Sequence, residues 1–441
     1  MKRRLREDAE RIIEASLKAV DPYQLIEEQV IRRGDSLFIS GREQVNLSDF
    51  ERIFLCGAGK GAAPIAKAME EILGNDLNGG DIIVKYDHLA ELKKVNLHEA
   101  AHPVPDKNGL EATKILLHHL DMLTDRDCVF VLLTGGGSAL LESLPEEIQL
   151  EDLQKLSSVL LKCSATIHEI NCIRKHISLI KGGQLARKIH PARCITLVLS
   201  DVIGDDLSVI ASGPTSPDPT SFNTALSILD KYEITTQIPE VILNYLRKGA
   251  NGKLMDTPKN DDELFQAVSN IIIGNNRLAL NKARETAESL GYKTIILTSM
   301  LQGEAKEIAK VVASIITEIQ ATGTPLEKPA CVLLGGEPTV KIEGSGKGGR
   351  NQELALAVAL THISESYTCV SIGSDGTDGP TDAAGAIVDH TTLSRAENAR
   401  LNPQEYLKNN DAYNFFAPLG DLVITGPTGT NVMDIVFALI P

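Results

Sequence analysis

Short apolar runs rich in β-branched residues alternate with longer helix-like stretches along most of this 441-residue chain. In the first half, the runs IFLCG, DIIVKY, VFVLL and CITLVL are separated by segments such as KGAAPIAKAMEEIL and NGLEATKILLHHL. Strands that are apolar throughout, with helices between them, are typical of parallel sheets buried on both faces. The alternation therefore predicts a three-layer α/β fold, in which helices cover both faces of a mainly parallel sheet.

A second series of strand-like runs begins near residue 265, after a stretch rich in Pro, Asp, Asn and Thr. Residues of this kind mark connections between folding units, and a single core seldom extends beyond about 250–300 residues. We therefore predict an N-terminal domain over residues 1–245, a linker over 246–264 and a C-terminal α/β domain over 265–441.

The composition excludes several classes of function. A net charge of −15, the absence of Trp and a low aromatic content argue against a nucleic-acid partner. No window is long and apolar enough to span a membrane. The seven cysteines form no C-x-x-C pair, and most adjoin apolar runs, which indicates small buried residues in a reducing compartment. We therefore expect a cytoplasmic enzyme.

The first strand-like run ends in a glycine-rich turn, GAGKGA, over residues 57–62. Gly57 and Gly59 fit the dinucleotide-binding pattern, which also requires an acid about 20 residues later at the end of the second strand. Asp87 is the nearest candidate, and it lies somewhat late. Lys60 suits a compact anion, such as a carboxylate or a transferred phosphoryl group. The alternative is a tight turn with a solvated lysine.

Further glycines and charges follow other predicted strands, where ligands bind in open α/β sheets. Gly135, Gly136 and Gly137, followed by Ser138, suit a phosphate-binding nest or a turn in which the serine caps a helix. Asp201 directly follows another apolar run. It could position Mg²⁺ during phosphoryl transfer, or it could cap the next helix.

Three more stretches carry charges. Arg174 and Lys181 lie on one predicted helical face, which is a basic stripe or an anion-binding surface. Glu337 follows a strand, and a long glycine series then brings Lys347 and Arg350 to the start of a helix. Such a loop is an anion site, because a guanidinium can grip a carboxylate or phosphate with two parallel bonds; the alternative is a flexible hairpin tip.

The last acidic stretch, SDGTDGPTD, contains Asp375, Asp378 and Asp382 after a strand. It lacks the glutamate that a calcium loop requires at its twelfth position, and Pro380 is unsuited to such a loop. Binding of magnesium with a nucleotide, or hydrogen bonding across a domain cleft, is the preferred interpretation.

Taken in order, these segments closely resemble the class II glycerate 2-kinases over nearly the whole chain. The resemblance is carried by GAGKGA, TGGGSALLE, RKHISLIKGG, LSDVIGDDLSVIASGPTSPDP, GGEPTV, GSGKGGRNQE, GSDGTDGPTDAAGA and TGPTGTNVMD. It implies an N-terminal Rossmann-like domain with a mainly parallel sheet. It also implies a C-terminal domain with a mixed sheet that contains the MOFRL region, at about residues 330–435.

The resemblance implies transfer of the γ-phosphoryl group of ATP to the 2-hydroxyl of D-glycerate, with Mg²⁺ or another divalent cation, in a cleft between the domains. The two basic residues tied to catalysis in that family fall on Lys60 and Arg350. Asp201 and Asp378 are weaker candidates for a base, and Asp201 is also the candidate metal ligand. The expected substrate- and phosphate-binding residues are Gly59, Gly135, Gly136, Gly137, Ser138, Arg174, Lys181, Glu337, Lys347, Asn351 and Glu353.

The main rival is a hydroxypyruvate reductase that uses NAD(P)H, because relatives of this kind often carry that label and Gly57 and Gly59 fit a dinucleotide turn. A non-catalytic metabolite sensor that has kept the ligand-binding cleft is a second alternative. The expected partners are two small molecules, D-glycerate and ATP. We expect no binding to nucleic acid or to a membrane, and a homodimer is one possible oligomeric state.

Overall fold

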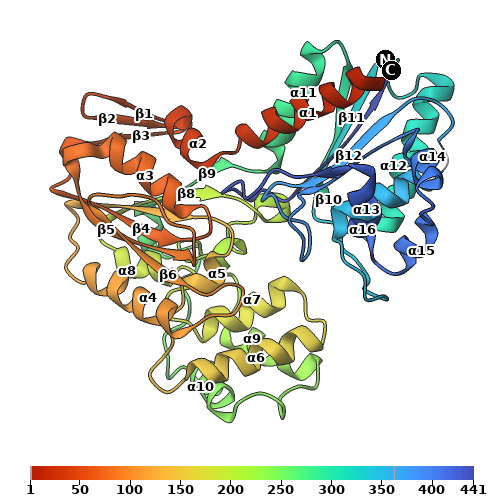
Figure 1. The fold of residues 1–441 in the computed structure, drawn as a ribbon. Helices are drawn as coiled ribbons and strands as arrows, with labels where there is room; N and C mark the ends of the chain where they lie inside the picture. The colour runs from red at the N-terminus through yellow and green to blue at the C-terminus, as the bar shows by residue number, and fades with distance from the viewer. Residues whose placement is uncertain (1, 362) are drawn as a thin grey trace. The chain divides into compact units, whose positions relative to one another are not determined.

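The computed structural model describes residues 2–361 and 363–441. The chain divides into two compact units, each treated below by itself. The central unit is Pro22–Ile273, and the terminal unit combines the chain up to Asp21 with Gly274–Pro441. Both units are of the α/β class, as the alternation of strands and helices predicts (Figure 1).

The central unit contains a six-stranded sheet in the order β6-β5-β4-β7-β8-β9. Its strands are β4 (Arg52–Ala58), β5 (Leu77–Lys85), β6 (Val95–Ala100), β7 (Asp127–Leu133), β8 (Arg193–Leu199) and β9 (Val268–Gly274). The pairings of β4 with β5 and β7, of β5 with β6 and of β7 with β8 are all parallel. This is the mainly parallel, Rossmann-like sheet that the sequence predicts.

Helices cover both faces of this sheet. Those that follow its strands are α3 (Ala62–Leu73), α4 (Lys107–His119), α5 (Gly137–Leu140) and α8 (Gln184–Ile189). Figure 1 shows α3 and α4 on opposite faces. Every position of β7 is buried, as expected for a strand that is covered on both faces. The parallel arrangement brings the carboxyl ends of β4, β7 and β8 to one edge, which is where the glycine-rich loops begin.

Two smaller parts complete the central unit. A three-stranded antiparallel sheet follows α2 (Pro22–Gln29) and consists of β1 (Val30–Arg33), β2 (Ser36–Ile39) and β3 (Glu43–Asn46). A helical part with its own apolar core contains α6 (Leu150–Lys162), α7 (Ile167–His176), α9 (Phe222–Lys231) and α10 (Glu240–Ala250).

The terminal unit contains a mixed sheet in the order β10-β11-β15-β12-β13-β14. Only β10 and β11 pair in parallel, and the remaining pairs are antiparallel. The strands are β10 (Lys293–Leu301), β11 (Ala330–Gly336), β12 (Thr368–Gly373), β13 (Gly385–Asp389), β14 (Leu422–Val423) and β15 (Asp434–Ile440). The mixed sheet implied by the resemblance is therefore confirmed.

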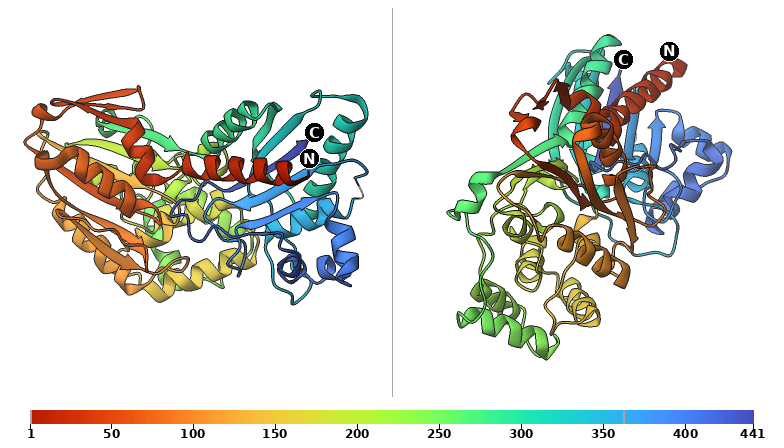
Figure 2. Two further views of the ribbon diagram at one scale, coloured as in Figure 1. Left: turned by 45° about the horizontal axis from the view of Figure 1, so that its top comes forward. Right: turned by 90° about the vertical axis from the view of Figure 1, so that its left-hand side faces the viewer.

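The helices of the terminal unit are α1 (Lys2–Lys18), α11 (Asn276–Ser289), α12 (Ala305–Thr322), α13 (Arg350–Ala359), α14 (Thr392–Asn398), α15 (Pro403–Lys408) and α16 (Ala412–Phe416). In Figures 1 and 2, α1 (red) lies beside α11 (green). The main apolar core of the unit lies between the sheet and α12 and α13.

The units do not end where the sequence predicts a first domain of residues 1–245. Helix α1 belongs to the terminal unit, because its apolar side chains pack on α11. Leu5, Ile12 and Ile13 are buried, and the Tyr292 hydroxyl donates to the Asp8 carboxylate at 2.9 Å. An amphipathic helix shows in a sequence that it needs a partner surface, but not which surface provides it.

The predicted linker, residues 246–264, is also placed differently. Its first part completes α10, which ends at Ala250. Asp256 then accepts a hydrogen bond from His176 of α7, so the segment is packed within the central unit. Polar and breaker residues predicted a connection here, and in the structure they make internal hydrogen bonds instead. Among the residues that the structure describes, no helix has the length and apolar character needed to cross a membrane.

Candidate active site

The loops after β4 and β7 are joined by hydrogen bonds into one surface of the central unit. The N–H of Lys60 donates to the carbonyl of Gly135 at 2.9 Å. The N–H of Thr134 donates to the carbonyl of Ala58 at 3.2 Å, and the Thr134 hydroxyl accepts from the N–H of Gly61 at 3.0 Å. The structure therefore brings the lysine loop and the triple-glycine loop together, although 75 residues separate Lys60 from Gly135.

The glycines of the lysine loop are required by the protein itself. Gly57 and Gly59 have φ values of +142° and +146°, and a Cβ on either would collide with β7 or the residue after it, at Leu132 and Thr134. These two glycines thus allow β4 to approach its neighbour closely. The two glycines that match the dinucleotide pattern are therefore required for the packing of β4 against β7.

The N–H groups of this loop are also fully used. Those of Gly59, Lys60, Gly61 and Ala62 donate to the Ile83 carbonyl at 3.1 Å, the Gly135 carbonyl at 2.9 Å, the Thr134 hydroxyl at 3.0 Å and the Gly59 carbonyl at 3.3 Å. A dinucleotide site needs free backbone donors at this turn to hold the pyrophosphate. The loop of residues 59–62 offers none.

The triple-glycine loop differs in this respect. Among the described residues, the N–H groups of Gly135, Gly136 and Ser138 have no backbone or side-chain acceptor, whereas that of Gly137 donates to the Thr134 carbonyl at 3.2 Å. Gly136 has φ of +88°, a left-handed conformation that favours glycine. Three free donors in one short loop suit phosphate oxygens.

Lys60 and His102 flank Gly136. A Cβ on Gly136 would lie 3.0 Å from Cδ2 of His102 and 3.3 Å from Cγ of Lys60. Burial lowers the pKa of His102 to about 4, and the nearby charges of Lys60, Lys85 and His88 act in the same direction. The imidazole is therefore neutral near pH 7, in an environment that favours anions.

The interpretation of the sequence missed His102. It lies two residues after the end of β6, and parallel strands end at the same edge of a sheet. Recognition of β6 as a strand would therefore have been enough to predict the position of His102. The polar sequence VNLHEA concealed that strand, because it lacks the apolar, β-branched character of the others.

Asp201 follows β8, the strand next to β7, after a single buried residue, Ser200. The order of the strands therefore puts Asp201 at the same edge of the sheet as the triple-glycine loop. The residues that the structure describes include no group of three or more His, Cys, Asp or Glu placed to hold a metal ion. Asp201 thus belongs to no such group of side chains.

Arg174 and Lys181, which the sequence predicts to bind substrate or phosphate, have internal partners in this structure. Lys181 is 0% exposed and pairs with Glu142 at 2.9 Å, and burial lowers the pKa of its ammonium group. The Ser178 hydroxyl donates to the same carboxylate at 2.7 Å. Arg174 is largely buried and donates to the Ser157 hydroxyl at 3.1 Å. Both cations hold α7 and the loop after it within the fold.

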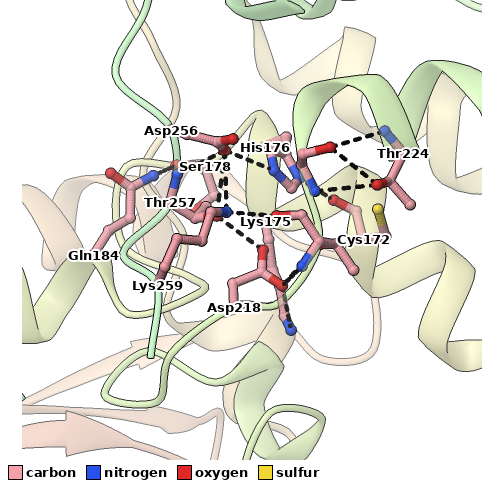
Figure 3. A network of polar contacts seen from close by, with 12 residues as sticks. Cys172, Lys175, His176, Ser178, Gln184, Asp218, Thr224, Asp256, Thr257 and Lys259 are labelled. Atoms are coloured by element: carbon pink, nitrogen blue, oxygen red, sulfur yellow. Dashed lines mark hydrogen bonds and ion pairs between the residues drawn. The ribbon is translucent and has the colours of Figure 1, made fainter. Parts of the chain in front are cut away.

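The neighbouring residues of the same motif form a second internal network (Figure 3). Lys175 pairs with Asp218 at 3.4 Å, and His176 lies 3.0 Å from the Asp256 carboxylate. The Thr257 hydroxyl donates to Asp218 at 3.1 Å. These contacts attach residues 251–265 to α7, which explains why this segment belongs to the central unit.

The network makes the stability of the central unit depend on pH. Burial disfavours the His176 cation, but its bonds to Asp256 and Cys172 raise the pKa of His176 to about 9, against an ordinary value of 6.5. A raised folded-state pKa stabilises the protein fully below pH 6.5, and this contribution is lost as the pH rises through 9. We expect a loss on the order of 2 kcal/mol, allowing for solvent screening at Asp256.

Thermal unfolding measured between pH 6 and pH 10 checks this prediction, with His176→Gln as the comparison. The wild-type midpoint should fall between pH 6.5 and 9, and the variant should lack this part of the fall. Parallel profiles for the two proteins would show that His176 is not the titrating group.

In the terminal unit, Arg350 is held by two carboxylates. Its Nε and Nη2 donate to Asp434 at 2.6 and 2.9 Å, and its Nη1 donates to Glu337 at 3.0 Å. Burial raises the pKa of Asp434 against the pull of the guanidinium, while Asp434 raises the pKa of Arg350 despite the arginine's own burial. Asp434, at the start of β15, was not predicted as a site residue.

Asp378 has a role that the sequence did not suggest. Its carboxylate accepts from the N–H groups of Asn351 at 3.1 Å and Gln352 at 2.8 Å, at the first turn of α13. Gly349 permits this contact, because a Cβ there would collide with Asp378. The place that an anion would take at this helix start is filled by a carboxylate of the protein. In this structure the Asp378 carboxylate, a candidate base in the sequence, caps the start of α13.

The glycine series before α13 serves packing. The N–H groups of residues 344–347 donate to Asn409, Asn410 and Asp411, in the turn between α15 and α16. A Cβ on Gly344 or Gly346 would collide with this turn. The backbone donors of this part of the loop are thus used within the terminal unit.

Three other predicted residues of this unit also have internal partners. Asn351 accepts from the Ser371 hydroxyl at 2.6 Å, and Glu353 accepts from the Asn410 amide at 2.8 Å. Both are buried, and burial raises the pKa of Glu353. Lys347 is exposed, with Nζ 4.0 Å from the centre of the Tyr413 ring. Among the predicted residues of this unit, Arg350 and Glu337 form the one pair that is in direct contact and also partly exposed to solvent.

Comparison with known proteins gives two family models. Residues 8–247 match a domain of unknown function, DUF4147, and residues 330–434 match the MOFRL family. The chain is 41% identical to a glycerate 2-kinase of Pyrococcus horikoshii, over 99% of this chain and 97% of the relative. It is 42% identical to a D-glycerate 2-kinase of Thermotoga maritima, over 97% of both chains.

A protein called a putative hydroxypyruvate reductase, from Agrobacterium vitis, is 39% identical over 87% of this chain and 86% of its own. Among solved structures, a glycerate kinase of Thermotoga maritima matches with a TM-score of 0.89 at 40% identity, and all of both chains is covered. A protein from Pyrococcus horikoshii OT3 matches with a TM-score of 0.87 at 40% identity, over 99% of this chain and 98% of its own.

Proposed function

This chain belongs to the glycerate 2-kinase family, and from that membership we infer that it transfers the γ-phosphoryl group of ATP to the 2-hydroxyl of D-glycerate. The products are 2-phosphoglycerate and ADP. The observation that carries this conclusion is the 41–42% identity with two glycerate 2-kinases over nearly the full length of each chain. The chain is thus an ATP-dependent kinase that acts on an alcohol group.

Phosphoryl transfer depends mostly on positioning and on stabilising charge, because the transition state is loose. We propose that the free N–H groups of Gly135, Gly136 and Ser138 hold phosphate oxygens of the nucleotide. Lys60, whose side chain lies against Gly136, then supplies positive charge to the group being transferred. His102, neutral and beside the same glycine, is proposed to hydrogen-bond the acceptor.

In the terminal unit, we propose that Arg350 binds an anionic group of the substrates. A guanidinium has five N–H donors, and three are used by Asp434 and Glu337. The two remaining N–H groups can bind a carboxylate or a phosphate. Asp434 and Glu337 hold the guanidinium in place, so its orientation is set before a substrate arrives.

A divalent cation fits this arrangement only as a partner of the nucleotide. The described residues have no group of three or more His, Cys, Asp or Glu placed to hold a metal ion, which argues against a cation held by such side chains alone. Mg²⁺ in kinases is commonly held by one or two carboxylates together with phosphate oxygens. We propose Asp201 as the carboxylate; when bound there, the cation would neutralise charge on the phosphates.

The rival activity, reduction of hydroxypyruvate, is suggested by the name of the Agrobacterium relative. It requires a nicotinamide dinucleotide, which a Rossmann-like fold binds through free N–H groups at the first glycine turn. In this chain, the N–H groups of residues 59–62 all have acceptors in the protein. This occupancy favours the kinase.

The test is an assay with D-glycerate, ATP and Mg²⁺, after which enolase alone is added. Enolase converts 2-phosphoglycerate directly to phosphoenolpyruvate, whose absorbance should rise at once. A parallel reaction contains hydroxypyruvate and NADH, and no oxidation of NADH is expected. Consumption of NADH without any ATP-dependent product would contradict the kinase and favour the reductase.

Two further proposals concern the state of the protein in the cell. All seven cysteines are free, and six of them are buried, which supports a reducing compartment and hence the cytoplasm. The second proposal is that the protein forms a homodimer. Light scattering coupled to size-exclusion chromatography would distinguish a homodimer from a monomer.

A further inference from the structure

A short chain of hydrogen bonds runs from the triple-glycine loop into the interior of the central unit. Oγ of Ser138 lies 2.7 Å from Oγ of Ser212, and the Ser212 hydroxyl donates to Oδ1 of Asn171 at 2.9 Å. Ser138 is partly exposed, whereas Ser212 is 0% and Asn171 is 3% exposed. The chain thus leads from a partly exposed residue to a buried amide on α7.

The direction of these bonds follows from counting protons. A serine hydroxyl has one proton to donate, and a carbonyl oxygen such as Oδ1 of Asn171 only accepts. Because Ser212 gives its proton to Asn171, it has none for Ser138. Ser138 must therefore be the donor in the bond between the two serines. Its own proton is committed to the interior, and only its lone pairs are available to a ligand.

The backbone holds Ser212 in this position at a cost. Ala211, Ser212 and Gly213 have consecutive φ values of +50°, +63° and +64°, although the first two carry side chains. Left-handed conformations at residues with side chains are strained, and they cluster at functional sites. The carbonyl of Ser212 also accepts from the N–H of Gly182 at 3.0 Å, which secures the segment on a second side.

We propose that Ser138 serves only as a hydrogen-bond acceptor towards the substrates, and that Ser212 and Asn171 are positioning residues that fix it in this state. The proposal rests on the proposed function of the loop. A phosphate oxygen is itself an acceptor, so the partner of the Ser138 oxygen is electropositive. Two sources fit this chemistry, namely the hydroxyl of glycerate and the divalent cation carried by the nucleotide.

The first test is a double-mutant cycle with Ser138→Ala, Ser212→Ala and the double variant. If Ser212 acts through Ser138, its loss should lower kcat/KM about 10-fold in the wild type, as expected for one positioned hydrogen bond. In the Ser138→Ala background the same change should cost less than about 2-fold. Equal losses in both backgrounds would make Ser212 merely structural and overturn the proposal.

The second test measures binding of ADP in EDTA by calorimetry, and so does not depend on turnover. Without a metal, the acceptor role predicts that Kd is the same for Ser138→Ala and the wild type, within about 2-fold. A weakening of 5-fold or more would mean that the Ser138 hydroxyl donates to a phosphate, and it would overturn the proposal. The exposed Ser227, changed to alanine, is the matched control.

Two further measurements distinguish the partners, and each supports the acceptor role. Weaker Mn²⁺ binding to the ADP complex of Ser138→Ala, measured by electron paramagnetic resonance, identifies the cation. A raised KM for glycerate with unchanged Mn²⁺ binding identifies the hydroxyl. Failure of the proposed function can be distinguished from both of these results. It would appear in the wild-type protein, as binding of the nucleotide without phosphorylation of glycerate.

Discussion

Replacement of Lys60 by alanine is expected to lower kcat for phosphorylation of glycerate by about 10²–10³-fold, the usual effect of losing one preorganised electrostatic group. Among the described residues, no partner forms a hydrogen bond or ion pair with the Lys60 ammonium. The variant should therefore fold normally, with an unchanged thermal midpoint. Steady-state kinetics and thermal unfolding of the same preparation measure the two quantities.

Lys67→Ala is a matched control, because Lys67 lies on α3, which follows the same loop, and is similarly half-buried. It should keep activity within about 2-fold, because Lys67 lies outside the loops proposed to bind the substrates. A second readout is the pKa of His102, which the Lys60 charge helps to lower. That pKa should rise in Lys60→Ala, as followed by the imidazole signals in NMR. Full activity in Lys60→Ala would remove this lysine from the chemistry.

Replacement of Arg350 by alanine is expected to reduce both activity and stability. It would leave Asp434, which is 1% exposed, without its bidentate partner. An uncompensated buried carboxylate costs about 3–5 kcal/mol, and it can escape this cost only by binding a proton. Denaturant unfolding should therefore show a large loss for Arg350→Ala at pH 8, and a smaller loss at pH 5.

The double variant Arg350→Ala/Asp434→Asn separates the two effects. It removes both charges, so most of the stability should return while activity remains low. Arg350→Lys keeps a charge but not the two parallel bonds, and intermediate values are expected for both quantities. If the double variant regains activity together with stability, Arg350 acts only in folding, and the proposal that it binds a substrate is contradicted.

The position of the loops proposed to bind the substrates could be predicted, because parallel strands end at one edge of a sheet. Lys60, Gly135 and Asp201 each follow an apolar run, and the structure places them after β4, β7 and β8, which are neighbours. His102 lies at the same edge but follows a polar strand, so the same reasoning passed over it. The prediction missed His102 because β6 was not recognised as a strand. The rule that parallel strands end at one edge of the sheet applies to β6 as well.

Whether each polar side chain contacts a ligand or a partner inside the protein could not be predicted in the same way. Lys181, Asn351 and Glu353 stand in glycine-rich or basic motifs, and each has a partner inside the protein. Asp378 is a candidate base in the sequence, and in the structure its carboxylate caps α13. Motifs that identify a family include residues that shape its loops as well as residues that meet its substrates.

The sequence by itself determined the α/β class, the two series of strands, the family and the strand ends at which the loops lie. These properties depend on periodicity and on glycine positions, which are local. Only the tertiary structure decided which donors and charges remain available to a ligand. Arg350 meets Asp434 across 84 positions, and Lys60 donates its N–H to Gly135 across 75. A hydrogen-bonding group can be assigned to a substrate only when its partners in the fold are known, and these partners come from distant parts of the chain.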